Sequence, residues 1–169
     1  MTIDERVHAL GLSFPEAYRS TTGAAYPFSW VRLRGNRAYV SGHLPLQSDG
    51  TLAEPRGKIG ETLSVEQGAV AARLVGLAML GSLKRELGEL ERIKAWLRVL
   101  GMVNVSPGVA DIAVVVNGFS ELILEVFGRE RGAHARSAVG MAELPFGVPV
   151  EIEAEVEIEE LRTYREKQP

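Results

Sequence analysis

Two β-prone stretches near the end of the sequence decide the fold: Arg136-Ser137-Ala138-Val139-Gly140-Met141 and Val150-Glu151-Ile152-Glu153-Ala154-Glu155-Val156. In the second stretch apolar and acidic residues alternate, which predicts a strand with one apolar face and one acidic face. Like charges on one face repel each other unless water surrounds them. Most of the glutamates are therefore expected to be exposed to solvent. Leu144-Pro145 and Gly147 lie between the stretches and predict a turn that joins them into a terminal hairpin.

Upstream of this hairpin the sequence predicts a helix and a long strand. Ser64 and Gln67 have the spacing of a capping box, and apolar residues then recur at helical spacing to about Leu87. Gly88 ends this helix, and the glycines inside it predict close packing against a sheet. Residues 93–104 are rich in β-compatible side chains and predict the strand.

A second helix follows the long strand. Ser106-Pro107 has the pattern of a cap and a first-turn proline, and apolar residues continue at helical spacing from there. Gly128 is predicted to end this helix, and residues 129–135 are predicted to form a charged loop that leads to the final strands.

The first part of the sequence predicts a short helix over residues 3–10 and a hairpin of residues 28–34 and 37–42 around Gly35-Asn36. The order of the main elements is therefore ββαβαββ, which indicates an α+β domain with two helices packed on one face of a mixed sheet. We expect an N-terminal extension over residues 1–19, one domain over 20–160 and a tail over 161–169.

Composition narrows the function classes. The chain has 169 residues, a formal net charge of −3 and no cysteine, so a disulfide, a thiolate nucleophile and a cysteine-based metal site are excluded. His8, His43 and His134 lack metal-ligand spacing, and we expect no metal and no cofactor. The acidic balance argues against nucleic acid, and the sequence contains no signal peptide or apolar membrane span, which favours a cytoplasmic protein.

Arg136 is the residue that suggests specific chemistry. On its face of the strand it is followed by Ala138 and Gly140, whose small side chains leave space beside the guanidinium. An arginine in such a place can hold a carboxylate through two parallel hydrogen bonds at every working pH. An ordinary surface or ion-pair arginine is the alternative interpretation.

The same stretches resemble the terminal signature of the RidA/YjgF family, also called endoribonuclease L-PSP, whose best-studied members are enamine/imine deaminases. The resemblance rests on Arg136 to Gly140, on Leu144-Pro145 and on Val150 to Ala154, and Val40-Ser41-Gly42-His43-Leu44-Pro45 resembles a further family motif. It implies a chorismate-mutase-like fold and a homotrimer with sites in the clefts between neighbouring subunits.

The resemblance also implies roles for individual residues. Arg136 matches the arginine that holds the substrate carboxylate, and Glu151 matches the glutamate that orients or activates water. The cleft-lining positions are Tyr26, Gly42, His43, Asn117 and Ala138. His43 stands where glutamine is common in the family, and Ala138 stands where many deaminases carry a cysteine.

The function implied by the resemblance is hydrolysis of small 2-aminoacrylate-like enamines or imines to 2-keto acids and ammonia. Such substrates hydrolyse spontaneously, so positioning by Arg136 and one acid/base group, Glu151, suffices. The alternative is a non-catalytic protein on the same scaffold that binds a small carboxylate and does not need Glu151. A ribonuclease is disfavoured by the acidic balance.

Overall fold

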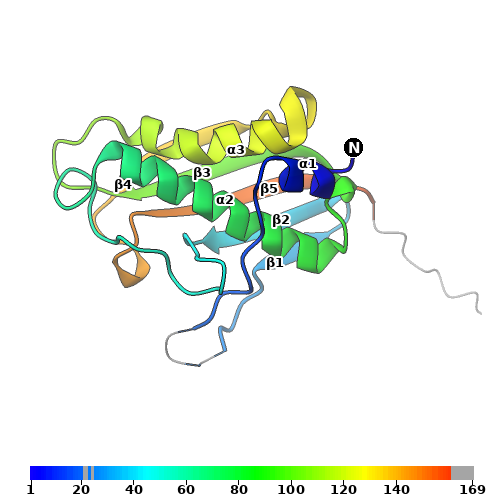
Figure 1. The fold of residues 1–169 in the computed structure, drawn as a ribbon, viewed down its shortest axis with the longest axis horizontal. Coiled ribbons are helices and arrows are strands. Elements are labelled where there is room, and N and C mark those ends of the chain that lie inside the picture. The colour runs from blue at the N-terminus through cyan, green and yellow to red at the C-terminus, as the bar shows by residue number, and fades with distance from the viewer. Residues whose placement is uncertain (21–22, 24, 161–169) are drawn as a thin grey trace, which may run out of the picture.

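A five-stranded sheet in the order β1-β2-β5-β3-β4 forms one layer of the protein. The computed structural model describes residues 1–20, 23 and 25–160. Two long helices, α2 (Val65–Leu87) and α3 (Ile112–Gly132), cover one face of the sheet, and α1 (Ile3–Ala9) lies near one end of them (Figure 1). The strands are β1 (Val31–Arg34), β2 (Arg37–His43), β3 (Ile93–Asn104), β4 (Ala135–Met141) and β5 (Val150–Ile158). The predicted α+β class, with two helices on one face of a mixed sheet, is confirmed.

The predicted terminal hairpin is wrong, because β3 lies between β4 and β5. β3 pairs with β5 in antiparallel fashion and with β4 in parallel fashion. Parallel neighbours require a crossover, and α3 provides it between β3 and β4. The turn signal is real, since Pro145–Gly147 forms a short 3-10 helix, but residues 142–149 carry the chain past β3 to its far side. β5 thereby becomes a central strand between β2 and β3.

The helix α2 agrees with its prediction at both ends. The Ser64 hydroxyl accepts the N–H of Gln67, the Gln67 side chain accepts the N–H of Ser64, and Gly88 follows the last turn with φ +85°. The glycines on α2 face the other helix as well as the body of the protein. A Cβ at Gly76 would lie 2.6 Å from a Leu122 methyl group of α3. These small residues therefore allow the two helices to lie close together. The sequence had predicted instead that they pack against the sheet.

The helix α3 differs from its prediction at both ends. It begins at Ile112, not at Ser106, because Ser106 donates both its N–H and its hydroxyl to the Ile59 carbonyl. These bonds connect the end of β3 to the loop between β2 and α2. At the other end Gly128 leaves helical geometry (φ 71°, ψ 172°), yet the chain makes one more helical turn to Gly132. The Arg131 guanidinium holds that turn to the Ile93 carbonyl, 3.0 Å from Nε.

The core lies between the sheet and the helices. Trp96 is 2% exposed and packs edge-on between Phe119 and Phe127 of α3, with ring centroids 5.8 Å apart in each pair. Ile3 and Val7 of α1 are buried in the same core, which anchors the N-terminal helix. Within the described part of the chain, no helix has the length and apolar content needed to cross a membrane.

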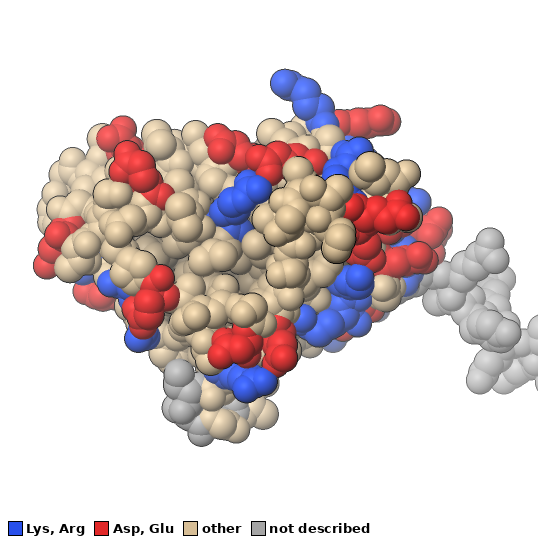
Figure 2. Space-filling model, viewed as in Figure 1, with Lys and Arg blue, Asp and Glu red and all other residues tan. Residues whose placement is uncertain are grey.

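On the face in view in Figure 2, uncharged residues form most of the surface, and patches of Lys and Arg lie beside patches of Asp and Glu. Some of them pair across elements, as Arg73 of α2 does with Glu125 of α3 at 2.6 Å. The mixed charge on this face differs from the continuous basic surface that tracks a nucleic-acid backbone.

Candidate functional site

The sheet places the two predicted catalytic residues on opposite faces. Arg136 of β4 is paired with Val99, which is fully buried beneath the helices, so the Arg136 side chain leaves the sheet on the helix-covered side. Glu151 of β5 lies between Val150 and Ile152, both fully buried, and therefore points to the open face. Within one chain the two side chains do not share a space.

Arg136 is held by α3 at the edge of the sheet. Its Nη1 donates to the Asn117 side-chain oxygen and to the Ser120 hydroxyl, each at 3.0 Å, and its Nη2 donates to the Ala113 carbonyl at 3.2 Å. A guanidinium has five N–H groups. The Nε–H and one Nη2–H of Arg136 have no partner among residues 1–20, 23 and 25–160. The structure thus brings Arg136 and Asn117 together and leaves two donors for a ligand.

His134 extends this cluster. Its Nδ1 lies 2.7 Å from the Gly132 carbonyl, which can only accept, so the proton is on Nδ1 and the unprotonated Nε2 accepts from the Ser120 hydroxyl at 2.9 Å. Burial, opposed by the bond to Gly132 and aided by the Arg136 charge, lowers the His134 pKa. Ser120 therefore accepts from Arg136 and donates to His134, and the chain of bonds fixes the guanidinium.

Sequence reasoning missed Ser120 and considered His134 as a candidate metal ligand but not as part of this site. One signal was available for His134: it precedes Arg136 by two residues, which puts both side chains on the same face of a strand. Ser120 gives no such signal, because only the packing of α3 against β4 brings it there.

Glu151 and Gly42 are brought together on the open face. A Cβ built on Gly42 would lie 2.0 Å from Oε1 of Glu151, so the carboxylate occupies the space above the glycine. Burial, with a smaller contribution from the Glu153 charge, raises the pKa of Glu151. A raised pKa makes a half-buried carboxyl a better proton acceptor and donor for general acid–base catalysis than an ordinary exposed glutamate.

The other predicted cleft residues lie in different surroundings. His43 is 3% exposed and faces α2, where Nε2 lies 2.9 Å from the Ser82 hydroxyl; burial lowers its pKa to about 4. Tyr26 is 37% exposed, and the centroid of its ring lies 5.9 Å from the centroid of the Trp30 ring. Ala138 stays near Arg136, half-buried on the same face of β4.

The predicted residues thus form three groups within one chain. Arg136, Asn117 and Ala138 lie where β4 meets α3, Gly42 and Glu151 lie on the open face, and Tyr26 and His43 both contact Trp30. No group of three or more His, Asp or Glu side chains that could hold a metal ion occurs among the described residues. A single chain therefore does not bring Arg136 and Glu151 into one site.

Comparison with known proteins identifies relatives of this chain. The family described as YjgF/chorismate mutase-like, putative endoribonuclease, matches residues 4–148. The chain is 40% identical over 150 residues to Protein TCP17 of Trypanosoma cruzi, covering 88% of this chain and 89% of that protein.

Two crystal structures are also similar over nearly their whole length. Atu1372, a protein of unknown function from Agrobacterium tumefaciens, is 37% identical with a TM-score of 0.83, covering 93% of this chain and 92% of that one. A putative endoribonuclease from Shewanella oneidensis is 30% identical with a TM-score of 0.83, covering 94% and 100%.

Proposed function

The chain belongs to the RidA/YjgF family, and from this membership we propose that it hydrolyses small 2-aminoacrylate-like enamines and imines to 2-keto acids and ammonia. The observation that carries the proposal is the fixed Arg136 guanidinium, with Nε–H and one Nη2–H unpartnered among the described residues. A pre-positioned fork of this kind matches a carboxylate, the group that these substrates share.

The separation of Arg136 from Glu151 supports a site between subunits. We propose that the chain assembles as a homotrimer in which Arg136, Asn117 and Ala138 of one subunit face Gly42 and Glu151 of its neighbour. Because Arg136 lies at the sheet edge and Glu151 on the open face, only a second chain can complete the pair.

In the proposed reaction Arg136 holds the carboxylate while the enamine tautomerises to the imine. Glu151 takes a proton from water as the water oxygen bonds to the imine carbon, and the C=N electron pair moves to nitrogen, which is protonated. Glu151 gives that proton to the nitrogen, which completes the carbinolamine. Glu151 then carries the carbinolamine hydroxyl proton to the amine as the C=O bond forms and the C–N bond breaks, so that imine and water yield keto acid and ammonia. The raised pKa of Glu151 supports its role in these transfers.

The decisive assay generates 2-aminoacrylate in situ and follows the release of keto acid. Wild type is expected to exceed the uncatalysed rate, and Arg136→Ala and Glu151→Gln each to lose about 100-fold or more in kcat/KM. Arg129→Ala removes an exposed arginine from the end of α3 and serves as the matched control. The deaminase assignment would be contradicted if wild type did not accelerate keto-acid release, or if Arg136→Ala released keto acid as fast as wild type.

Co-expression of Arg136→Ala with Glu151→Gln tests the placement of the site. A mixed cyclic trimer of these two inactive chains contains one site with both residues intact, so activity should return in the mixture. Light scattering must show trimers, and mass spectrometry must show both chains in them. Mixed trimers without recovered activity would contradict a site shared between subunits.

The alternative function is non-catalytic binding of a small carboxylate, and Ala138, which offers no polar contact, is the observation that favours it. Calorimetry with 2-ketobutyrate separates the two functions. Normal binding with loss of all turnover in Glu151→Gln supports the enzyme, whereas Arg136-dependent binding by a wild type without turnover supports the binding protein.

A further inference from the structure

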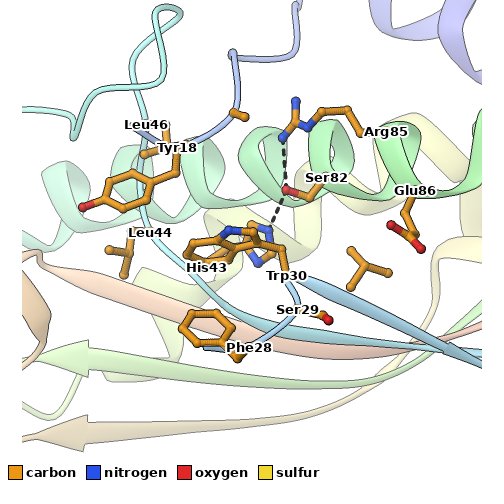
Figure 3. A pocket seen from close by; sticks show the side chains of 12 residues that line it. Tyr18, Phe28, Ser29, Trp30, His43, Leu44, Leu46, Ser82, Arg85 and Glu86 are labelled. Carbon is orange, nitrogen blue, oxygen red and sulfur yellow. Dashed lines mark hydrogen bonds between the residues drawn. The ribbon is translucent and has the colours of Figure 1, made fainter. Parts of the chain in front are cut away.

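A pocket lies between α2 and the β1–β2 end of the sheet, under the segment that follows α1. Its volume is about 370 Å³, within the range of small-molecule sites. Ring-bearing residues form one wall and side chains of α2 form the other (Figure 3). Arg136, Asn117 and Glu151 do not line it, so it is separate from the site proposed above.

The first wall is aromatic. The centroid of the Trp30 ring lies 5.1 Å from that of Phe28, 5.9 Å from that of Tyr18 and 5.2 Å from that of the His43 imidazole. Each pair is arranged edge to face. Phe28 is nevertheless 49% exposed, so these rings do not form a closed core. An open aromatic cluster offers faces and edges against which another flat apolar ring can pack.

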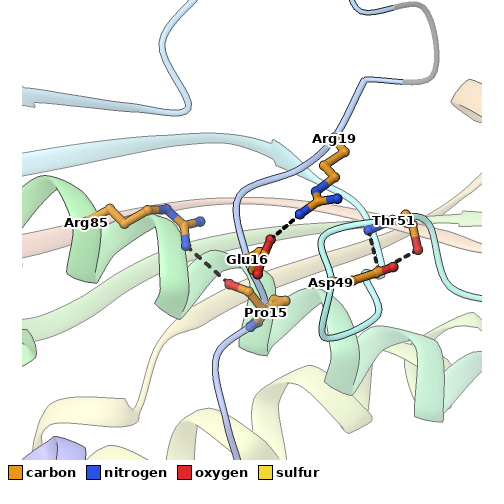
Figure 4. Close-up of polar contacts among 6 residues, drawn as sticks. All are labelled: Pro15, Glu16, Arg19, Asp49, Thr51 and Arg85. Carbon is orange, nitrogen blue, oxygen red and sulfur yellow. Dashed lines mark hydrogen bonds and ion pairs between the residues drawn. The ribbon is translucent and has the colours of Figure 1, made fainter.

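The second wall carries a cation, Arg85, that is held by neutral groups. Arg85 donates from Nη2 to the Ser82 hydroxyl at 3.1 Å and from Nη1 to the Pro15 carbonyl at 3.2 Å (Figures 3 and 4). No carboxylate of the described residues forms an ion pair with it, whereas the adjacent Lys84 pairs with Asp4 at 2.7 Å. Arg85 is thus held in place by neutral groups, and three of its five N–H groups have no partner among residues 1–20, 23 and 25–160.

The remaining charges around the pocket restrict the ligand. His43 is neutral at physiological pH and both its nitrogens are engaged, with the Ser41 carbonyl and the Ser82 hydroxyl, so it contributes its ring only. Glu86 also lines the pocket and brings one negative charge near it. A ligand with several negative charges would be repelled by Glu86, while a single carboxylate is matched by Arg85.

We propose that this pocket binds a small aromatic monocarboxylate, with its carboxylate on the Arg85 guanidinium and its ring against Trp30 and Phe28. The site requires only one chain. It is therefore independent of the reaction proposed for Arg136 and Glu151.

The two tryptophans allow a direct test. Trp30 lines the pocket, while Trp96 is buried in the core, so quenching of tryptophan fluorescence by phenylacetate reports on Trp30. The titration uses the full chain carrying Arg136→Gln, which removes the other expected carboxylate site. Saturable quenching is expected in this background and in wild type, and its loss in Trp30→Phe assigns the signal. Absence of quenching at millimolar phenylacetate would overturn the proposal.

Arg85→Gln is expected to weaken phenylacetate binding about 10-fold or more, since it removes a charge-assisted pair. Lys84→Gln removes the neighbouring charge, which is already paired with Asp4, and should leave the affinity unchanged. Circular dichroism checks that each variant folds, and Arg85→Lys, which keeps the charge, should bind better than Arg85→Gln. Equal affinity in Arg85→Gln, or tighter binding of phenethylamine than of phenylacetate, would contradict the assignment.

Discussion

Two regions of this protein contain the same chain of hydrogen bonds in different surroundings. At the sheet edge, Arg136 donates to Ser120 at 3.0 Å, Ser120 lies 2.9 Å from Nε2 of His134, and Nδ1 of His134 lies 2.7 Å from the carbonyl two residues earlier. Where α2 faces the end of β2, Arg85 and Ser82 of the helix and His43 of the strand repeat the pattern at 3.1, 2.9 and 2.7 Å. In both, a neutral histidine orients a serine that fixes an arginine.

The difference between these clusters is burial. His43 is 3% exposed and links the sheet to α2, so its protonation would break a contact between layers. His134 is half-buried and links α3 to the neighbouring strand near the surface, where water can replace a lost bond. The same bonds are therefore expected to contribute more to folding stability in the His43 cluster than in the His134 cluster.

The largest expected effect is the pH dependence of stability that His43 causes. In the unfolded chain His43 binds a proton near pH 6.5, but in the folded protein only near pH 4, so its contribution is complete above pH 6.5 and is lost as the pH falls towards 4. The full loss is about 3 kcal/mol. Urea unfolding of wild type and His43→Gln across this range measures it, and parallel curves for the two proteins would refute the linkage.

A smaller effect separates the two serines. Ser82→Ala leaves the buried Nε2 of His43 without a donor and should lower the free energy of unfolding by about 2 kcal/mol. Ser120→Ala, at the half-buried cluster, should lower it by less than about 1 kcal/mol. Denaturant unfolding at pH 7.5 compares them directly. Equal losses would mean that burial does not distinguish the clusters.

The smallest effect concerns the proposed substrate site. Ser120→Ala removes one bond that fixes Arg136 and is expected to raise KM for the carboxylate substrate roughly five-fold, about 1 kcal/mol. Ser82→Ala is the matched control, because Ser82 bonds Arg85 instead. Steady-state kinetics on the folded variants measure both KM values. An equal rise in KM in Ser120→Ala and Ser82→Ala would contradict a specific role of Ser120 in fixing Arg136.

Local patterns in the sequence predicted the elements that local forces determine. The capping box at Ser64 and the alternation from Ile93 to Asn104 predicted α2 and β3 at their observed bounds. The position of β5 depends on pairing with β2 and β3, which are distant in sequence, and a turn signal at Pro145 could not reveal it. The start of α3 was mispredicted because Ser106 bonds Ile59 instead of capping a helix.

The candidate site was predictable to the same extent. Arg136 and Asn117 follow from family motifs, and the structure places them 3.0 Å apart at their nearest polar atoms. The bonds from Ser120 to His134, and from Ser82 to His43, join residues that are 14 and 39 positions apart. Neither spacing corresponds to a strand or helix period that would bring the side chains together, so only the folded structure reveals them.

The contact between Gly42 and Glu151 has an evolutionary consequence. Because the carboxylate fills the space that a Cβ at position 42 would need, an alanine there must displace it. A lineage that depends on this glutamate can keep only glycine at position 42, whereas a lineage that has abandoned it is free to drift there. The two positions should therefore change together, and a side chain at position 42 in a descendant would be the mark of an acid that is no longer in use.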